Sequence, residues 1–547
     1  MKKIRGQAAA ALTLFSFFAG IAWGAPQSAP GKPGNSTGSS TAVQADHAGS
    51  YYHFMLARRY EELAGIYANG NYAERAIAEL QKAVADDPHS LFLHDQLGDI
   101  YWRVGRLSDA TAEAQLVLKE NPNDLDAHRL LGHVYVHELG GSQGTAQGNV
   151  AGNLKKAIQE YETVVRLDPK DTRSEILLGR LYQLSNQPSE AARIFKGILN
   201  GNPNSVEALT YLGRLDINQE DYKQGVGILE KIPQDQRGPS TYAMLGLAYS
   251  QLGDFSNAAR NFKTALDIDP VNVDVRRQYA DALMRSGQTA LAREQFQQIL
   301  KADPKDGRTD LRLGQLDEAE GHFPEATQEL NQAQSLLPGD LEADYAQAQL
   351  QTALGHEDAA IKILKGLLAK TSNSNGKYTA DQATDRGAFL ERLALVYRSQ
   401  ENYDQAIATL KQMLTLGGDE APRAEGLIVE TLQLEGKLPE AAAEARAAVQ
   451  KYPKNQSLNL EYATVLGEQG HVNEAVSKLR NFASSGGGDG VQARLQIVQV
   501  YSEAKHYRDA QEQAQRLLQE NLKASDKEYA EFLLGSVYER EKKYDLA

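Results

Sequence analysis

Apolar residues recur three and four positions apart along most of the chain, with polar and charged residues between them. Ala76, Leu80 and Ala83 show this spacing, which places their side chains on one face of a helix. Short stretches that contain glycine or proline divide the chain into many such segments. The pattern therefore predicts a succession of amphipathic α-helices, each with one face buried against its neighbours.

The helical segments form a repeat of about 34 residues. One position is nearly always small, the residue three places later is often tyrosine, and the residue twelve places later is nearly always alanine. We expect the small residues where two helix axes approach closely, because a leucine there would push the helices apart. These three positions include Gly98, Gly179, Gly246, Gly314 and Gly535, then Tyr101, Tyr182 and Tyr249, then Ala110, Ala191 and Ala258.

Glycine and proline punctuate the repeat at fixed offsets. Gly105, Gly253 and Gly436 fall between the two helical segments of their repeats, where a tight turn needs a residue that tolerates positive φ. Pro88, Pro203 and others follow the second segment, where a missing N–H group ends the helix. Each repeat is therefore expected to be two helices joined by a tight turn.

This combination resembles the tetratricopeptide repeat family. The resemblance covers residues 51–547, in 13 units plus the first helix of a fourteenth, so the chain is expected to end within a repeat. It implies an all-α fold, a right-handed α-solenoid of tandem helix-turn-helix units. The period is interrupted near 138–150 and 371–385; we interpret both insertions as surface loops, the alternatives being a contact loop and a joint.

The start of the chain has the layout of a secretory signal peptide. Lys2, Lys3 and Arg5 precede an uncharged run from Ala8 to Trp23, and this run is shorter than a membrane-spanning helix usually is. Residues 1–24 are therefore predicted to direct export to the periplasm or cell envelope. The alternative is that they remain as an uncleaved membrane anchor; no other integral membrane segment is expected.

Residues 25–50 are rich in Pro, Gly, Ser and Thr, which favours a disordered linker. Beyond it, composition narrows the function. With 72 Asp+Glu against 58 Lys+Arg, the net charge of −14 argues against a nucleic-acid partner. The absence of cysteine excludes disulfides, thiolate metal sites and a cysteine nucleophile.

No known catalytic or cofactor-binding motif occurs in the sequence, so we expect neither an enzyme nor a bound cofactor. His133 and His137 lie four residues apart on one helical face, a spacing that can supply two zinc ligands. No third ligand is visible at a fixed spacing. The sequence therefore predicts no metal site.

In the resembled family, the first helix of each unit supplies most of the inner, ligand-facing surface. Carried over position by position, this predicts a groove with a local basic strip that could bind an acidic peptide or sugar polymer. The alternative is that Asp126, Glu207, Asp274 and Asp281 on the same helices neutralise the strip. The groove residues are Arg129, His133, Arg173, Arg180, Arg214, Arg277 and Arg285, flanked by His137 and Arg308.

These observations favour a non-catalytic scaffold of the cell envelope that binds protein or peptide partners along its groove. Two other functions fit the same pattern. The array resembles the periplasmic part of bacterial polysaccharide synthesis and export proteins. It could also be the regulatory solenoid of a larger enzyme that continues beyond Ala547.

Overall fold

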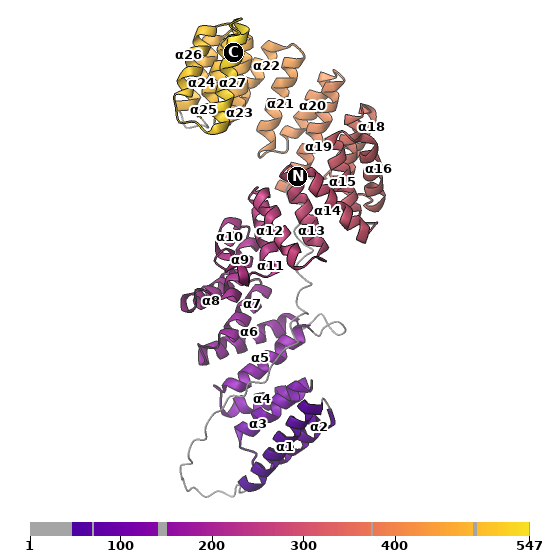
Figure 1. Ribbon diagram of the computed structural model, residues 1–547, viewed down its shortest axis with the longest axis vertical. Coiled ribbons are helices and arrows are strands. Elements are labelled where there is room, and N and C mark those ends of the chain that lie inside the picture. The colour runs from indigo at the N-terminus through magenta and orange to yellow at the C-terminus, as the bar shows by residue number, and fades with distance from the viewer. Residues whose placement is uncertain (1–45, 68–69, 141–149, 374–375, 485–489, 546–547) are drawn as a thin grey trace. The chain divides into compact units, whose positions relative to one another are not determined.

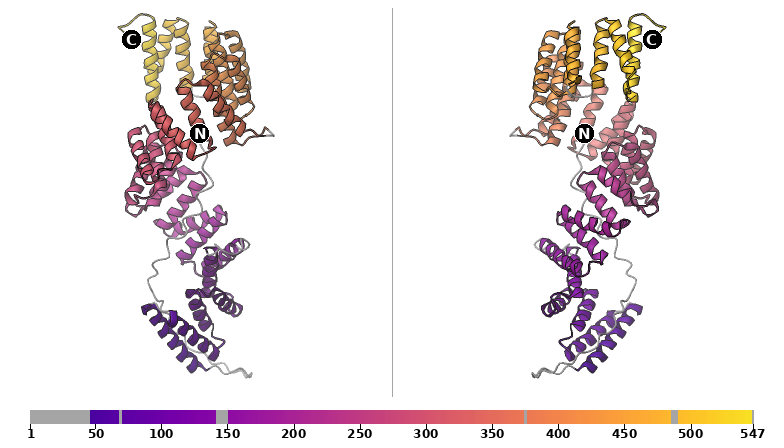
Figure 2. Two further views of the ribbon diagram at one scale, coloured as in Figure 1. Left: turned by 90° about the vertical axis from the view of Figure 1, so that its right-hand side faces the viewer. Right: turned by 90° about the vertical axis from the view of Figure 1, so that its left-hand side faces the viewer.

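The computed structural model describes residues 46–67, 70–140, 150–373, 376–484 and 490–545 (Figure 1). Across these ranges the chain forms 27 α-helices, one short 3-10 helix and no strand. The all-α prediction is therefore confirmed. The helices divide into two compact units at residue 297, here called the N-terminal half and the C-terminal half. The helix pairs of each half are also visible in Figure 2.

The helices of the N-terminal half are α1 (His47–Tyr67), α2 (Gly70–Asp86), α3 (Leu91–Arg103), α4 (Leu107–Glu120), α5 (Leu125–Gly140), α6 (Val150–Leu167), α7 (Thr172–Leu184), α8 (Pro188–Gly201), α9 (Val206–Asn218), α10 (Tyr222–Leu229), α11 (Pro239–Gln251), α12 (Phe255–Ile268), α13 (Val273–Arg285) and α14 (Thr289–Ala302), the last of which crosses residue 297. The 3-10 helix, Gln234–Gln236, precedes α11.

The helices of the C-terminal half are α15 (Gly307–Glu320), α16 (Phe323–Leu336), α17 (Leu341–Ala353), α18 (Glu357–Lys370), α19 (Ala380–Ser399), α20 (Tyr403–Leu414), α21 (Glu420–Leu434), α22 (Leu438–Lys451), α23 (Gln456–Glu468), α24 (Val472–Ser484), α25 (Gly490–Glu503), α26 (Tyr507–Leu518) and α27 (Ala524–Arg540). Odd-numbered and even-numbered helices alternate as first and second helices of a repeat. The described helices thus form thirteen pairs plus one, as the repeat predicts.

The turns within the pairs use the left-handed backbone conformation. Gly105 and Gly253 have φ of 79° and 81°, as expected for glycine at the end of a helix. At the same offset in other repeats, Asn186 and Lys505 also have positive φ. Turn geometry is therefore preserved even where glycine is absent, at some cost in backbone strain.

The small positions lie where the two helices of a pair touch. A Cβ atom added to Gly179 would lie 2.6 Å from the ring of Phe195, and one added to Gly246 would lie 2.6 Å from the ring of Phe262. Gly314 is similarly close to Leu330 of its pairing helix α16, whereas a Cβ atom added to Gly98 would lie 2.8 Å from Leu130 of α5, in the next repeat, and 3.4 Å from Glu113 of its pairing helix α4. Gly535 is half-buried in α27. The alanines of the second helices, Ala110, Ala191 and Ala258, are fully buried.

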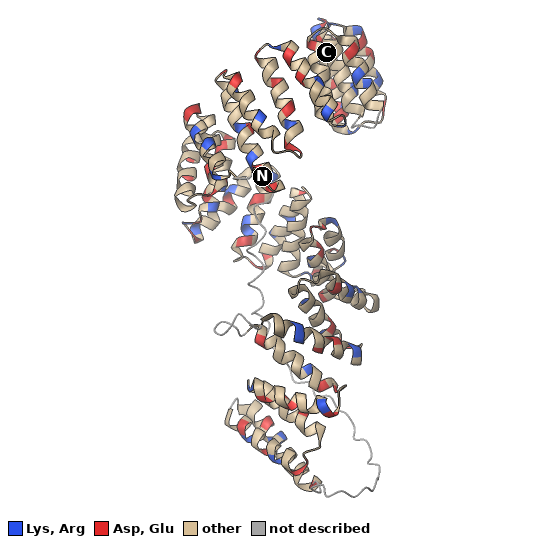
Figure 3. Ribbon diagram, turned by 180° about the vertical axis from the view of Figure 1, so that it is seen from behind, with Lys and Arg blue, Asp and Glu red and all other residues tan. Residues whose placement is uncertain are grey.

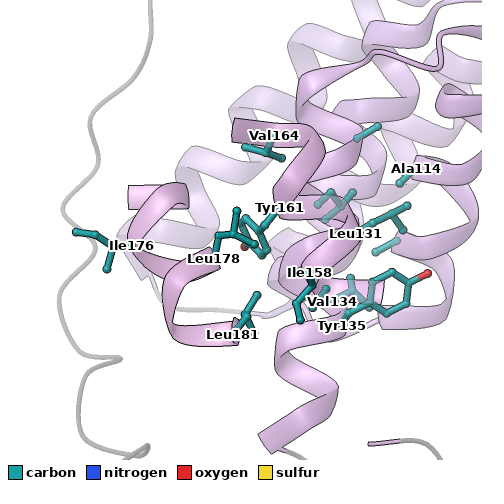
Figure 4. Close-up of a cluster of buried hydrophobic side chains, with 14 of the residues drawn as sticks. Ala114, Leu131, Val134, Tyr135, Ile158, Tyr161, Val164, Ile176, Leu178 and Leu181 are labelled. Atoms are coloured by element: carbon teal, nitrogen blue, oxygen red, sulfur yellow. The ribbon is translucent and has the colours of Figure 1, made fainter. Parts of the chain in front are cut away.

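The repeat tyrosines connect each pair to the preceding one. The Tyr101 hydroxyl accepts a hydrogen bond from Gln81 Nε2 at 2.8 Å. The Tyr249 hydroxyl donates to Glu230 Oε1 at 2.6 Å, and Tyr182 bonds the Glu162 carboxylate in the same way. Apolar packing continues between repeats, as Figure 4 shows for the cluster that includes Tyr161 of α6 and Leu178 of α7. Nearest-neighbour contacts of this kind are typical of solenoids.

Some boundaries differ from those expected. The first helix begins at His47, within the predicted linker 25–50, because Asp46 Oδ1 accepts a hydrogen bond from Gly49 N. The second insertion is shorter than 371–385, because Thr379 and Gln382 form a capping box that starts α19 at Ala380. The signal segment 1–24, most of the linker and residues 141–149 of the first insertion lie outside the described residues.

None of the helices in the described ranges is long and apolar enough to cross a membrane. The right-handed superhelical twist stays a prediction.

Candidate functional site

The odd-numbered helices form the inner layer of each half. Besides its pairing partner, an odd-numbered helix contacts the next odd-numbered helix, as α3 does with α5, α7 with α9 and α9 with α11. Between the even-numbered helices that are described, no contact of this extent occurs. Because curvature brings the helices of the inner layer closer together, the first helix of each repeat faces the concave side.

The predicted groove residues of the N-terminal half all lie on inner helices, but two of the arginines are neutralised. Arg129 on α5 pairs with Asp126 at 3.1 Å and with Asp171, the N-cap residue of α7, at 3.0 Å. Arg277 on α13 pairs with Asp274 at 3.0 Å. At these positions the alternative of local neutralisation is correct, and neither arginine offers a free charge.

Arg180 on α7 and Arg214 on α9 differ from these two. Neither has a carboxylate within ion-pair distance among the described residues; instead, both guanidinium groups lie over the ring of Tyr211. The distances from the guanidinium carbon to the ring centroid are 5.6 Å for Arg180 and 4.8 Å for Arg214. Cation–π attraction of this kind holds a positive charge in place without neutralising it.

The surroundings fix the position of this pair. The Tyr211 ring stacks on Phe195, with 5.5 Å between centroids and 14° between ring planes. Arg214 Nη2 donates to Gln183 Oε1 at 3.4 Å. Burial, to which the positive charge of Arg180 adds, lowers the pKa of Arg214. Burial and the neighbouring charge thus both disfavour the positive charge of Arg214, and an anion bound between the two guanidinium groups would offset these effects.

Arg173 extends the pair. It lies seven residues before Arg180 on α7, is exposed, and has no carboxylate partner in the described structure. Arg173, Arg180 and Arg214 are here called the Arg cluster. Figure 3 shows basic and acidic residues mixed along most helices, so the cluster is a local feature on a mixed surface. Arg285 on α13 is exposed but separate, with its guanidinium carbon 5.1 Å from the Phe255 ring centroid.

The histidines of α5 contact a tryptophan. His133 stacks on Trp102 of α3 at 5.9 Å between centroids, and His137 meets the same ring edge-on at 5.4 Å. Burial, followed by the nearby Arg129 charge, lowers the pKa of His133. His128 bonds Glu160 through Nδ1 and the Pro122 carbonyl through Nε2. All three rings thus have partners within the protein.

In the described ranges, one group of three side chains has the types and spacing that could bind a metal ion: Asp317, Glu320 and His322, at the turn between α15 and α16. His322 Nδ1 lies 3.4 Å from Asp317 Oδ1 and 3.5 Å from Glu320 Oε2. Glu320 and His322 are exposed. We interpret this group as a helix-end ion-pair cluster, which sequence analysis did not identify.

The sequence also did not point to Tyr211 and Gln183 as site residues. Tyr211 precedes Arg214 by three residues on α9, so the helical spacing did place the two side chains on one face. The contact of Arg180 with the same ring depends on how α7 packs against α9, which the spacing does not specify.

Comparisons with known proteins all point to the same family. Tetratricopeptide repeat models match residues 96–172, 151–205, 184–246 and 390–424, and the model described as the TPR domain of cytochrome c-type biogenesis protein H matches residues 225–344. The chain is 25% identical over 335 residues to the TPR repeat-containing protein YpiA of Bacillus subtilis; the match covers 60% of this chain and 74% of the relative.

Solved structures also match the chain, at low identity. Yeast Tom70 matches with a TM-score of 0.41 and 14% identity, over 86% of this chain and 99% of that one. YrrB, described as a TPR protein with an unusual peptide-binding site, matches with a TM-score of 0.33 and 19% identity, over 35% and 99%. The repeated helix pairs and the family-model matches together identify the chain as a tetratricopeptide repeat protein.

Proposed function

We propose that this protein is a non-catalytic scaffold whose inner helices bind partner proteins, and that the Arg cluster binds an acidic segment of one partner. The observation that carries the proposal is the pair Arg180 and Arg214, two guanidinium groups over the Tyr211 ring with no described carboxylate beside them. The two positive charges beside one ring repel each other, and a bound anion would offset this repulsion.

The chemistry of the cluster suits carboxylates on an extended chain. A guanidinium group offers a planar fork of N–H donors that matches a carboxylate. Arg173 and Arg180 are seven residues apart on α7, about 10 Å along a helix, which about three residues of an extended peptide would span. A segment with several Asp or Glu residues could therefore contact all three arginines.

Export is the second part of the proposal. Lys2, Lys3 and Arg5 followed by an uncharged run support a signal peptide, and the mature protein would then act in the cell envelope. Mass spectrometry of the N-terminal peptide from an envelope fraction tests this. A mature start near Ala25 is expected, whereas an intact Met1 in a cytoplasmic fraction would contradict export.

The acidic-segment proposal is tested by fluorescence anisotropy with a labelled hexaglutamate peptide. Arg180→Glu/Arg214→Glu is expected to weaken binding about a hundredfold or more, since it removes two charge-assisted contacts that each contribute about 1.5–3 kcal/mol. The control is Arg193→Glu/Arg260→Glu, which makes the same charge change at exposed positions of the even-numbered helices α8 and α12. Equal losses in both double variants would show a general charge effect and refute the cluster.

Affinity capture with the same two double variants then tests the scaffold itself. Partners that wild type and the control retain, and that Arg180→Glu/Arg214→Glu loses, are expected to carry acidic segments. Recovery of the same partners by all three proteins would mean that recognition lies elsewhere on the array.

A further inference from the structure

One repeat of the C-terminal half breaks the apolar pattern of its inner helix. The residue immediately before the small position is leucine, isoleucine or tyrosine in thirteen repeats, but in the ninth it is Gln347 on α17. Four residues later, where the other repeats mostly have tyrosine or leucine, this repeat has Gln351. The apolar residues are Leu63, Leu97, Leu131, Leu178, Leu212, Leu245, Tyr279, Leu313, Leu393, Ile428, Tyr462, Ile497 and Leu534.

Gln347 is buried without full hydrogen bonding. The residue as a whole is only 9% exposed to solvent. Nε2 donates to Asn331 Oδ1 at 3.4 Å, but Oε1 is buried and has no hydrogen-bond partner. A buried acceptor left unsatisfied is unfavourable, so a glutamine at a core position needs a reason other than packing.

A cavity of about 400 Å³ opens at this glutamine. Asp344, Gln347 and Gln351 of α17 form its floor, and α18 supplies a wall of Ile363, Gly366 and Leu367 together with Ala359, Lys362 and Lys370. Gln334 of α16 also lines it, so the cavity opens between two even-numbered helices, on the side of the array away from the inner layer.

The floor presents hydrogen-bond acceptors without net charge. The Asp344 carboxylate accepts from Gln334 Nε2 at 2.9 Å and from Lys370 Nζ at 2.7 Å, which neutralises it. The unsatisfied atom, Gln347 Oε1, requires an N–H or O–H donor. Of the two lysines in the wall, Lys370 is paired with Asp344 and Lys362 is exposed to solvent. The rest of the wall is aliphatic and small, so an uncharged donor attached to a small apolar group would fit.

We propose that this cavity binds an extended peptide segment of a partner, whose backbone N–H group donates to Gln347 Oε1. A small aliphatic side chain of that peptide packs on Ile363 and Leu367. A peptide is favoured over a sugar because the cavity lining contains no aromatic ring on which a sugar could stack. This site is independent of the Arg cluster, which lies in the other half and recognises charge.

Methyl NMR spectra of the full chain, labelled at Ile and Leu, test the proposal with acetyl-Ala-Ala-Ala-amide as the probe. Saturable shifts of the Ile363 and Leu367 methyl signals are expected. The backbone N-methylated form of the same peptide, which lacks the donor, is expected to cause none. Shifts caused equally by both peptides would overturn the role of Gln347.

Two variants separate binding from folding. Gly366 lines the cavity, so the side chain introduced by Gly366→Leu should block it. The fold should tolerate this change, because a Cβ atom there meets no other atom within 4 Å. Gly197→Leu is the matched control, at the same repeat offset on α8 and equally open. Gln347→Leu restores the usual residue of the repeat, so it should abolish the peptide shifts while raising the midpoint of thermal unfolding.

Retained shifts in Gly366→Leu or Gln347→Leu would refute the site. Maltotriose serves as the sugar probe, and shifts with maltotriose but not with the peptide would refute a peptide ligand. If neither probe shifts these signals, water alone fills the cavity and the proposal is wrong. None of these outcomes affects the test of the Arg cluster, which uses a different probe and different variants.

Discussion

The guanidinium group of Arg180, on α7, lies over the ring of Tyr211, on α9, with 5.6 Å between its central carbon and the ring centroid. This contact joins two successive repeats on the inner layer. Arg214 approaches the same ring at 4.8 Å, so one aromatic side chain positions two positive charges. The ring is itself held by Phe195, a fully buried residue of α8. Tyr211 is therefore the residue that positions two arginines of the Arg cluster, Arg180 and Arg214.

Replacing Tyr211 tests this organising role. Tyr211→Phe keeps the ring and is expected to leave both stability and hexaglutamate affinity almost unchanged. Tyr211→Ala removes the stack on Phe195 and should destabilise the N-terminal half by about 2–4 kcal/mol, since it deletes a half-buried aromatic side chain. Urea unfolding and fluorescence anisotropy measure the two effects. Unchanged affinity in folded Tyr211→Ala would show that the arginines need no platform.

Helix contact at the small positions gives a second prediction. Gly179→Ala places a Cβ atom 2.6 Å from the Phe195 ring, and because that ring is fully buried, overpacking should cost about 1–3 kcal/mol. Gly197→Ala, on the exposed side of α8 where a Cβ atom meets nothing, should instead stabilise by about 0.5–1 kcal/mol through helix propensity. Similar unfolding midpoints for the two variants would contradict close helix contact at Gly179.

The carboxyl of Asp95, on α3, predicts a pH effect. Burial, to which the charges of Asp124 and Asp126 add, raises its pKa to about 7. Since the folded pKa exceeds the unfolded value, ionisation opposes folding, and stability falls as pH rises from about 4 to about 7. The free energy of unfolding of Asp95→Asn should equal that of wild type near pH 4 and exceed it above pH 7. Asp99→Asn, at an exposed position of the same helix, should show no such pH-dependent gain.

The pair that His94 forms with Glu113 predicts a second effect of pH on stability. A hydrogen bond from Nδ1 to Glu113 at 2.6 Å is the main cause that raises the pKa of His94, against the opposing effect of burial. The pair therefore stabilises the fold below the unfolded histidine pKa of about 6.5, and this contribution disappears as pH rises through the raised folded pKa. Urea unfolding should show Glu113→Gln least stable relative to wild type near pH 5.5. A difference that does not shrink toward pH 9 would contradict an ionised histidine.

The sequence was sufficient for the helix pairs and for the family. Apolar spacing such as Ala76, Leu80 and Ala83 specifies one buried face per helix, and turn glycines such as Gly105 specify where the chain reverses. These are local requirements of backbone and burial, so they can be recognised without knowing which helices meet. The boundaries at Asp46 and Thr379 were misplaced because they depend on side-chain caps, not on hydrophobic spacing.

The candidate sites were only partly visible in the sequence. Arg129 and Asp126, three residues apart, could be paired from helical spacing, but the second bond of Arg129, to Asp171, crosses to the next repeat. Gln347 stands out once the repeats are aligned, whereas its unsatisfied oxygen and the cavity beside it depend on α16 and α18.

The sequence by itself determined an array of paired helices with a basic tendency on the first helix of several repeats. Only the tertiary structure decided which charges remain without a partner. Arg129 is paired with Asp171 of the next repeat, while Arg180 and Arg214 meet over Tyr211 without a carboxylate partner. The physical reason is range: hydrophobic periodicity acts within one helix, whereas neutralisation and desolvation of a charge depend on side chains brought together by packing between repeats.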